Sequence, residues 1–248
     1  MLKVRIIPIL TFNGFGLVKT KNFSNPRMVG NPVQSARVYN SRGVDELVFL
    51  DIFASHQKRK INLKLVAEVI KECYMPVAIG GGIESIDDIN NLLKIGADKV
   101  IIKTKALEDK NFIKEAVSFF GSQCISIAVD ATLTPNGYMI HNKLNLEITL
   151  GQFISDMIAC NVGELVVNSV DKDGLMNGFD IELMHQVESL TKIPIIAVGG
   201  GGKMEHYVNL FTNTKVKAVG SASIFHFTQF TPLDIKNELL KINIPVRI

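Results

Sequence analysis

Short apolar runs of strand length recur along the chain, and segments with helical periodicity separate them. The eight runs cover residues 4–10, 46–51, 77–79, 99–103, 125–130, 164–168, 195–198 and 216–220. Each run is nearly continuous in apolar character, which is typical of parallel strands covered on both faces. Between runs, Leu63, Val66 and Ile70 share one face of a helix. The pattern predicts repeated βα units around a parallel sheet.

Two segments depart from this alternation. Residues 11–30 form a long connection after the first run, and we predict a loop of the kind that serves as a lid or binding loop. Residues 132–149 contain the turn sequence Pro135-Asn136-Gly137, which predicts a small hairpin after the fifth run.

The chain also resembles itself at an offset of about half its length. Residues 46–50 (Glu-Leu-Val-Phe-Leu) align with residues 164–168 (Glu-Leu-Val-Val-Asn). The same repeat pairs Thr11 with Asp130 at the ends of the first and fifth runs. Such self-similarity indicates a fold built from two similar halves.

Length and repeat together predict the fold class. The 248 residues match the usual size of a (β/α)8 TIM barrel. We therefore predict a single α/β barrel domain spanning 1–248, with half-barrels of about 1–120 and 121–248. An open doubly wound sheet is the alternative, and eight roughly even units count against it.

Composition narrows the class of protein. The net charge of +3 is small and its lysines and arginines are scattered, which gives no sign of nucleic-acid or membrane-surface binding. The 3 cysteines form no C-x-x-C pair, which suits the cytoplasm. No apolar stretch approaches the length of a membrane span. The five histidines lack metal-ligand spacing, so we expect no metal and no cofactor.

Two glycine runs are candidates for anion binding. Residues 80–82 and 199–202 each lie between a strand and a helix, where backbone N–H groups can approach a phosphate. The strand after each run ends in a hydroxyl residue, Thr104 or Ser223. A tight strand-to-helix turn is the alternative for either run. Two runs in register favour a ligand with a phosphate at each end.

Carboxylates at strand ends are candidates for acid–base chemistry. Asp51, Asp130 and either Asp171 or Asp173 lie at the end where barrel enzymes keep their catalytic groups. A helix cap or turn is the alternative for each. Lys19, in the long first connection, could contact an anion or lie solvated on a lid.

With these residues in view, the chain resembles the cyclase (synthase) subunits of imidazole glycerol phosphate synthase nearly end to end. The most specific segments are residues 45–52, 77–83, 96–100, 120–124, 171–174, 202–206 and 223–227. The resemblance implies a barrel subunit of a glutamine amidotransferase of histidine biosynthesis. Such a barrel forms a heterodimer with a glutaminase, receives ammonia through its interior and adds it to a doubly phosphorylated ribonucleotide in a lyase-type reaction.

The resemblance also implies site residues. One phosphate is implied near Gly82, Lys103 and Thr104. The other is implied near Asp173, Gly174, Gly200, Ala222 and Ser223, and the substrate loop carries Lys19. The ammonia gate is implied at Arg5, Glu46, Lys99 and Glu164, and Asp98 at the glutaminase interface. Alternating charges at strand starts could equally have a purely structural role.

The chain departs from the family where the chemistry occurs. The family uses two aspartates as acid and base; Asp130 is the second, and Thr11 replaces the first. A threonine hydroxyl cannot serve as a general base near neutral pH without activation. Further departures are Lys103, Asn168 and Val198, where the family usually has Asn, Thr and Ser, and Asn13-Gly14-Phe15 in place of an Asp-Gly turn.

These departures leave several functions open. On mechanism we favour a divergent paralogue that supplies ammonia for amidation of a surface-polysaccharide sugar, with a sugar-amidating ligase as a further partner. The alternative is an authentic histidine-biosynthesis cyclase. A non-catalytic scaffold for the glutaminase would need no phosphate sites. The sibling isomerase of the pathway would need no gate.

Overall fold

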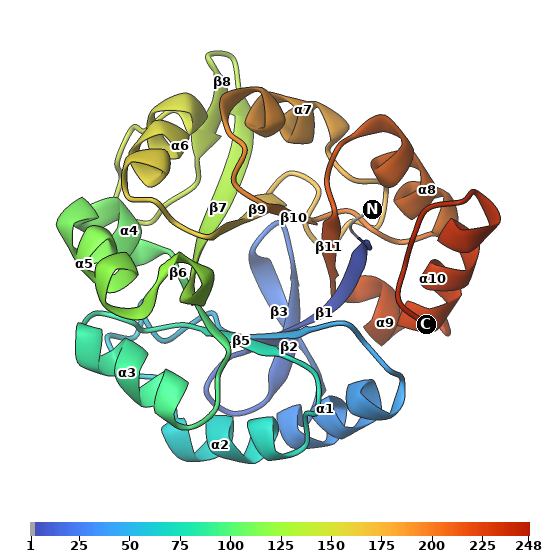
Figure 1. Cartoon of the computed structure of the whole chain (residues 1–248), viewed down its shortest axis with the longest axis horizontal. Helices are drawn as coiled ribbons and strands as arrows, with labels where there is room; N and C mark the ends of the chain where they lie inside the picture. Colours follow the sequence, from blue (N-terminus) through green and yellow to red (C-terminus); the bar gives the residue numbers. More distant parts are fainter. Residues whose placement is uncertain (1–2) are drawn as a thin grey trace.

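A closed ring of eight parallel strands forms the centre of the molecule in the computed structural model, which describes residues 3–248 (Figure 1). In ring order the strands are β1 (Arg5–Phe12), β4 (Leu47–Asp51), β5 (Val77–Gly80), β6 (Lys99–Ile102), β7 (Ile125–Thr134), β9 (Glu164–Ser169), β10 (Ile195–Val198) and β11 (Ala218–Ser221). Parallel pairing of β11 with β1, from Arg5 opposite Ala218 to Pro8 opposite Ser221, closes the ring. The predicted (β/α)8 barrel is confirmed, and the open sheet is excluded.

Helices surround the ring (Figure 1). They are α1 (Pro32–Ser41), α2 (Leu63–Lys71), α3 (Ile86–Lys94), α4 (Thr104–Glu108), α5 (Lys110–Phe120), the 3-10 turn η1 (Ser122–Cys124), α6 (Leu150–Ala159), α7 (Ile181–Leu190), α8 (Met204–Asn213), α9 (Ser223–Phe227) and α10 (Pro232–Lys241). Local chemistry fixes several starts. At α3, Ser85 and Asp88 form a capping box, in which each side chain accepts the other residue's backbone N–H.

Apolar side chains fill the barrel on both sides of the strands. The outer layer lies between the strands and the helices. The inner layer fills the lumen with Ile7, Ile9, Val48, Ala78, Ile101, Val166, Ile196 and Ala218. Because side chains alternate across a strand, one ring supplies both layers. The inner layer separates a base, where the strands begin, from a mouth, where they end.

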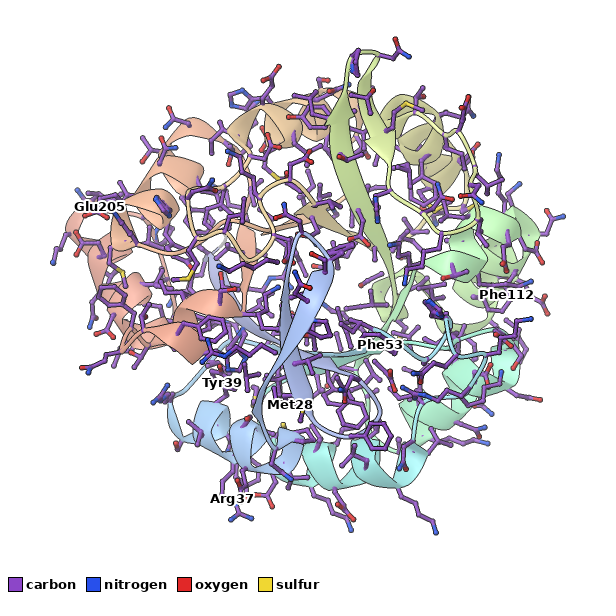
Figure 2. All side chains as sticks on the ribbon, turned by 180° about the vertical axis from the view of Figure 1, so that it is seen from behind. Met28, Arg37, Tyr39, Phe53, Phe112 and Glu205 are labelled. Atoms are coloured by element: carbon purple, nitrogen blue, oxygen red, sulfur yellow. The ribbon has the colours of Figure 1, made fainter. Side chains whose placement is uncertain are left out.

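The segment predicted as a long loop is a β-hairpin. Strands β2 (Leu17–Lys21) and β3 (Ser24–Gly30) pair antiparallel, and Leu17 lies opposite Phe12 of β1. The hairpin crosses the ring, and Figure 2 shows it on the near side with Met28 labelled. Most of β2 is buried, whereas β3 is nearly all exposed. The position at the mouth agrees with the prediction, but the backbone is regular.

The second predicted hairpin is present. Strand β8 (Gly137–Ile140) folds back on the extended end of β7, with Gly137 opposite Thr134. Within residues 3–248, no helix is long and apolar enough to cross a bilayer. The division into two half-barrels near residue 120 stays a prediction.

Candidate functional site

Four charged side chains meet at the base of the barrel. Arg5 Nη1 lies 2.7 Å from Glu46 Oε2, and Arg5 Nη2 lies 2.5 Å from Glu164 Oε1. Lys99 Nζ lies 3.1 Å from Glu46 Oε1 and 2.9 Å from Glu164 Oε2. Each cation contacts both carboxylates, so the four residues form a closed ring of alternating charge. We call this ring the base ring.

The base ring satisfies charges that are largely removed from water. Burial alone lowers the pKa of the Arg5 guanidinium, but the carboxylates of Glu164 and Glu46 raise it above its ordinary value. Burial alone raises the pKa of Glu164, but Arg5 and Lys99 hold it below its ordinary value. Mutual pairing therefore keeps Arg5 and Glu164 charged at neutral pH.

Asp98 lies at the same end, directly before β6. Its Oδ2 accepts the N–H of Val77 at 2.8 Å, and its own N–H donates to the Val77 carbonyl at 2.9 Å. The residue is exposed. These contacts hold the start of β5, and the predicted role at a partner interface stays a prediction.

At the mouth, the two positions of the expected acid–base pair are occupied differently. The Thr11 hydroxyl donates to the carbonyl of Val18, in the hairpin that covers it. Asp130 is buried near the end of the barrel part of β7, and its carboxylate forms an ion pair with Lys103 Nζ. Of these two positions, one therefore holds a carboxylate neutralised by an ammonium, and the other holds a hydroxyl.

Aromatic side chains cover this ion pair. Lys103 Nζ lies 5.5 Å from the ring centroid of Phe23, which follows β2. The His141 ring packs edge-on against the Phe23 ring, with 5.5 Å between the ring centroids. The backbone N–H of His141 donates to the Asp130 carbonyl at 2.7 Å. Burial and the Lys103 charge hold the pKa of His141 below its ordinary value, which favours the neutral imidazole at pH 7.

A second ion pair holds the hairpin over the mouth. Lys19 Nζ lies 2.8 and 2.9 Å from the two carboxylate oxygens of Asp173, and both residues are buried. The Asn22 N–H donates to the Asp173 carbonyl at 2.9 Å. At Gly174 a Cβ would lie 2.2 Å from the Thr20 carbonyl oxygen, so only glycine permits this approach. Lys19 and Asp173 thus bind each other.

The glycine runs allow loops to pack closely at the mouth. A Cβ at Gly82 would lie 2.6 Å from the Arg59 carbonyl oxygen, and one at Gly200 would lie 2.0 Å from the Gly178 carbonyl oxygen. Both glycines have positive φ. This packing agrees with the alternative reading of each run as a tight turn. Phosphate binding at Gly82 and Gly200 stays a prediction.

Two buried side-chain oxygens have no hydrogen-bond partner within residues 3–248: Asn168 Oδ1 and Ser223 Oγ. Asn168 lies beside Asp130 in the β7–β9 register. Ser223 begins α9, directly after Ala222, and Thr104 begins α4, directly after Lys103. An unpaired buried polar atom is costly. Both oxygens are therefore left available for hydrogen bonds at the mouth.

The other carboxylates at strand ends have structural partners. Both oxygens of Asp51 pair with Arg59, at 2.5 and 2.8 Å. Asp171 accepts the Leu133 N–H at 2.8 Å, which ties it to the second hairpin. The strand-end pattern could not reveal these partners, because Arg59 lies in an irregular segment and Leu133 lies in the β7 extension, 38 positions from Asp171. In residues 3–248, no cluster of three or more His, Cys, Asp or Glu side chains is arranged to hold a metal ion.

Sequence reasoning missed a buried ion pair between Asp45 and Lys236 at the base of the barrel. Their Oδ1 and Nζ atoms lie 2.9 Å apart, and both residues are almost fully buried. A lysine in an amphipathic helix is ordinarily exposed. The one available signal is the position of Lys236 beside Ile235 on the apolar face of α10.

Comparison with known proteins agrees with the resemblance. A family model described as "Histidine biosynthesis protein" matches residues 5–231. Relatives described as imidazole glycerol phosphate synthase subunit HisF are 41% identical in Staphylococcus saprophyticus and 39% in Streptococcus mutans, each over the full length of both chains. The HisF subunit of Clostridium botulinum is 38% identical over 98% of both chains. The chain therefore belongs to the histidine biosynthesis protein family and, within it, to the HisF subunits of imidazole glycerol phosphate synthase.

Proposed function

We propose that this chain is the synthase barrel of a glutamine amidotransferase, taking in ammonia at its base and using it on a phosphate-bearing acceptor at its mouth. The observation that carries the proposal is the base ring, which lies at one end of the lumen while Asp130 lies at the other. The imidazole glycerol phosphate synthase reaction is the first candidate, because the three relatives above all carry that name.

The base ring is the proposed gate for ammonia. A glutaminase subunit would dock at this end and form a heterodimer, with Asp98 at the interface, and we expect this complex in the cytoplasm. Beyond the ring the inner layer of the lumen is mainly apolar. A neutral ammonia molecule can cross such a lumen, whereas an ammonium ion would lose its hydration without gaining a partner.

The mouth is the proposed anion site. We assign one phosphate to Gly82, Lys103 and Thr104, where Lys103 supplies a positive charge. We assign the other to Asp173, Gly174, Gly200, Ala222 and Ser223, with Lys19 from the hairpin. The unpartnered Ser223 hydroxyl supports the second assignment, because a phosphate oxygen would satisfy it. Opening of the Lys19–Asp173 pair would free the lysine for the ligand.

Asp130 is the proposed acid–base residue. Thr11, at the second expected position, lacks the carboxylate that a second acid or base would need. The Thr11 hydroxyl already donates its proton to the Val18 carbonyl. This observation supports a second candidate function, in which ammonia is passed to a different acceptor, such as a surface-polysaccharide sugar carried by a separate ligase. The comparisons favour the histidine-pathway candidate.

A turnover measurement separates the two candidates. The purified chain is given ammonia and the histidine-pathway ribonucleotide, beside Thr11→Asp and the exposed control Thr212→Asp on α8. Wild-type turnover equal to that of an ordinary HisF subunit supports the first candidate. Activity that appears only in Thr11→Asp supports the second.

The heterodimer is tested separately, with a glutaminase co-expressed with the chain. Association and stimulation of glutamine hydrolysis are expected, and Arg5→Met is expected to weaken the coupling between hydrolysis and ammonia use. Absence of any association at micromolar concentrations contradicts the amidotransferase proposal for both acceptors.

A further inference from the structure

A buried ion pair next to the base ring takes no part in the proposed chemistry. Lys236 on α10 is 2% exposed and Asp45, before β4, is 6% exposed. Lys236 Nζ lies 2.9 Å from Asp45 Oδ1. Apolar residues of similar volume often replace such a pair without loss of stability, because desolvation of the charges offsets their attraction. Stability alone is therefore a weak account of these two charges.

The Asp45 carboxylate holds the backbone beside two members of the base ring. Its Oδ2 accepts the N–H of Ile6 at 2.8 Å, and Ile6 directly follows Arg5. Asp45 itself directly precedes Glu46. One side chain thus fixes β1 and the start of β4 at the positions from which Arg5 and Glu46 reach each other.

Lys236 in turn fixes the Asp45 carboxylate to the C-terminal helix. Besides Asp45, the Lys236 ammonium donates to the Gly43 carbonyl at 3.2 Å. The C-terminal segment also reaches β1 directly, because the N–H of Val4 donates to the Pro245 carbonyl at 2.8 Å. The C-terminal part of the chain is therefore connected to the base of the barrel at two places: Lys236 on α10 contacts the segment before β4, and Pro245 contacts Val4 directly before β1.

We propose that Asp45 and Lys236 are positioning residues for the base ring: they hold Arg5 and Glu46 in register, so that the ring stays closed. The role as an ammonia gate rests on the function proposed above. The geometric role does not, because it concerns only the contacts among these side chains.

A purely structural pair is the competing account, and it makes a different prediction. If the pair only stabilises the closed barrel, its removal lowers the unfolding temperature and leaves the base ring intact in the folded protein. If the pair positions the ring, its removal loosens the contact between Arg5 and Glu164 in protein that is still folded.

The test uses two double variants of the full chain. Asp45→Ala with Lys236→Met removes both charges and the Ile6 hydrogen bond. Asp45→Asn with Lys236→Met removes both charges and keeps an oxygen that can accept from Ile6, and it serves if the first variant does not fold. The matched control is Glu238→Ala with Lys241→Met, an exposed pair on the same helix, with 2.6 Å between Glu238 Oε2 and Lys241 Nζ.

Two NMR measurements report on the ring directly. The Arg5 Nη–H protons, which contact Glu46 and Glu164, should exchange with solvent at least tenfold faster in the Ala/Met variant than in wild type, and less so in the Asn/Met variant. The pKa of Glu164, which Arg5 and Lys99 hold low, should rise toward its ordinary value. Wild-type values for both in either folded variant, with only a lower unfolding temperature, would overturn the proposal.

A functional arm keeps this proposal separate from the proposed function. In a complex with glutaminase, the Ala/Met variant should release a larger share of glutamine-derived ammonia to solution, while its turnover with added ammonia stays at the wild-type rate. If ammonia is not a substrate, turnover with glutamine-derived ammonia and turnover with added ammonia are both absent in wild type as well. The NMR measurements still decide the positioning role.

Discussion

At the mouth, the ion pair between Asp130 and Lys103 places a positive charge beside the proposed acid–base residue. Lys103 carries its positive charge into a site covered by Phe23 and His141. We predict that Lys103→Met weakens binding of inorganic phosphate about tenfold, because a charged hydrogen bond contributes about 1.5–3 kcal/mol. Isothermal titration calorimetry measures the change. The control Lys105→Met removes the second residue of α4, a lysine that pairs with Asp109, and it should bind as wild type does.

Glu164 gives the base ring a defined dependence on pH. Its folded-state pKa lies below the ordinary value of 4.5, so it stabilises the fold above that pH. This contribution is lost as the pH falls through the lowered folded-state pKa. We predict that the difference in free energy of unfolding between wild type and Glu164→Gln shrinks over this range. Urea denaturation at a series of pH values tests this, and a constant difference would contradict it.

Single site residues could be predicted from the sequence where several of them together matched a known family arrangement. Arg5 and Glu46 were expected at the base, and the structure brings them together with the other two members of the base ring. Lys236 was not predictable, because its partner lies 191 positions away and a helical lysine is ordinarily solvated. Whether a charged side chain is paired depends on partners that are distant in sequence, and a local sequence pattern does not include those partners.

At the scale of elements, the β2–β3 hairpin is the part that sequence reasoning described least well. Its turn contains Asn22 and Phe23 with positive φ, a conformation rare for phenylalanine and therefore absent from the usual turn signals. The other hairpin carries a conventional glycine at Gly137, and it was predicted correctly. The helices and barrel strands follow their apolar periodicity closely.

Docking of the hairpin depends on the Lys19–Asp173 pair. We predict that Asp173→Asn increases amide hydrogen exchange in residues 17–30 by about tenfold, since it removes one charge of a buried pair worth roughly 1.5–3 kcal/mol. Hydrogen–deuterium exchange with mass spectrometry localises the effect. The exposed pair Arg37–Glu72 provides the control, and Arg37→Met should leave the hairpin unchanged. Equal exchange in both variants would show that other contacts hold the hairpin.

At the scale of the whole molecule, the loops at the mouth pack so closely that replacing certain glycines there is expected to lower the stability of the fold. Gly200→Ala would place a Cβ 2.0 Å from the Gly178 carbonyl oxygen at a positive φ. We predict destabilisation of more than about 1 kcal/mol. Gly151→Ala, in the open on helix α6, should instead stabilise by about 0.4–1 kcal/mol. Chemical denaturation of both variants checks the opposite signs.

The barrel as a whole was predictable because its units repeat. Eight apolar runs with helices between them allow either a closed or an open sheet, and the internal repeat favoured closure. No sequence pattern predicted the inner layer that divides the lumen, because Ile9, Val48 and Ile196 come together only after the ring has closed.

The apolar inner layer has a chemical consequence. An ion that entered between the base ring and the mouth would meet mainly the apolar side chains of the inner layer, which cannot replace its water. On the proposed ammonia route, an ammonium ion would have to lose a proton before it could cross this layer. If the proposed route through the barrel is used, ammonia would therefore reach Asp130 as the neutral free base, with its lone pair available to attack an acceptor.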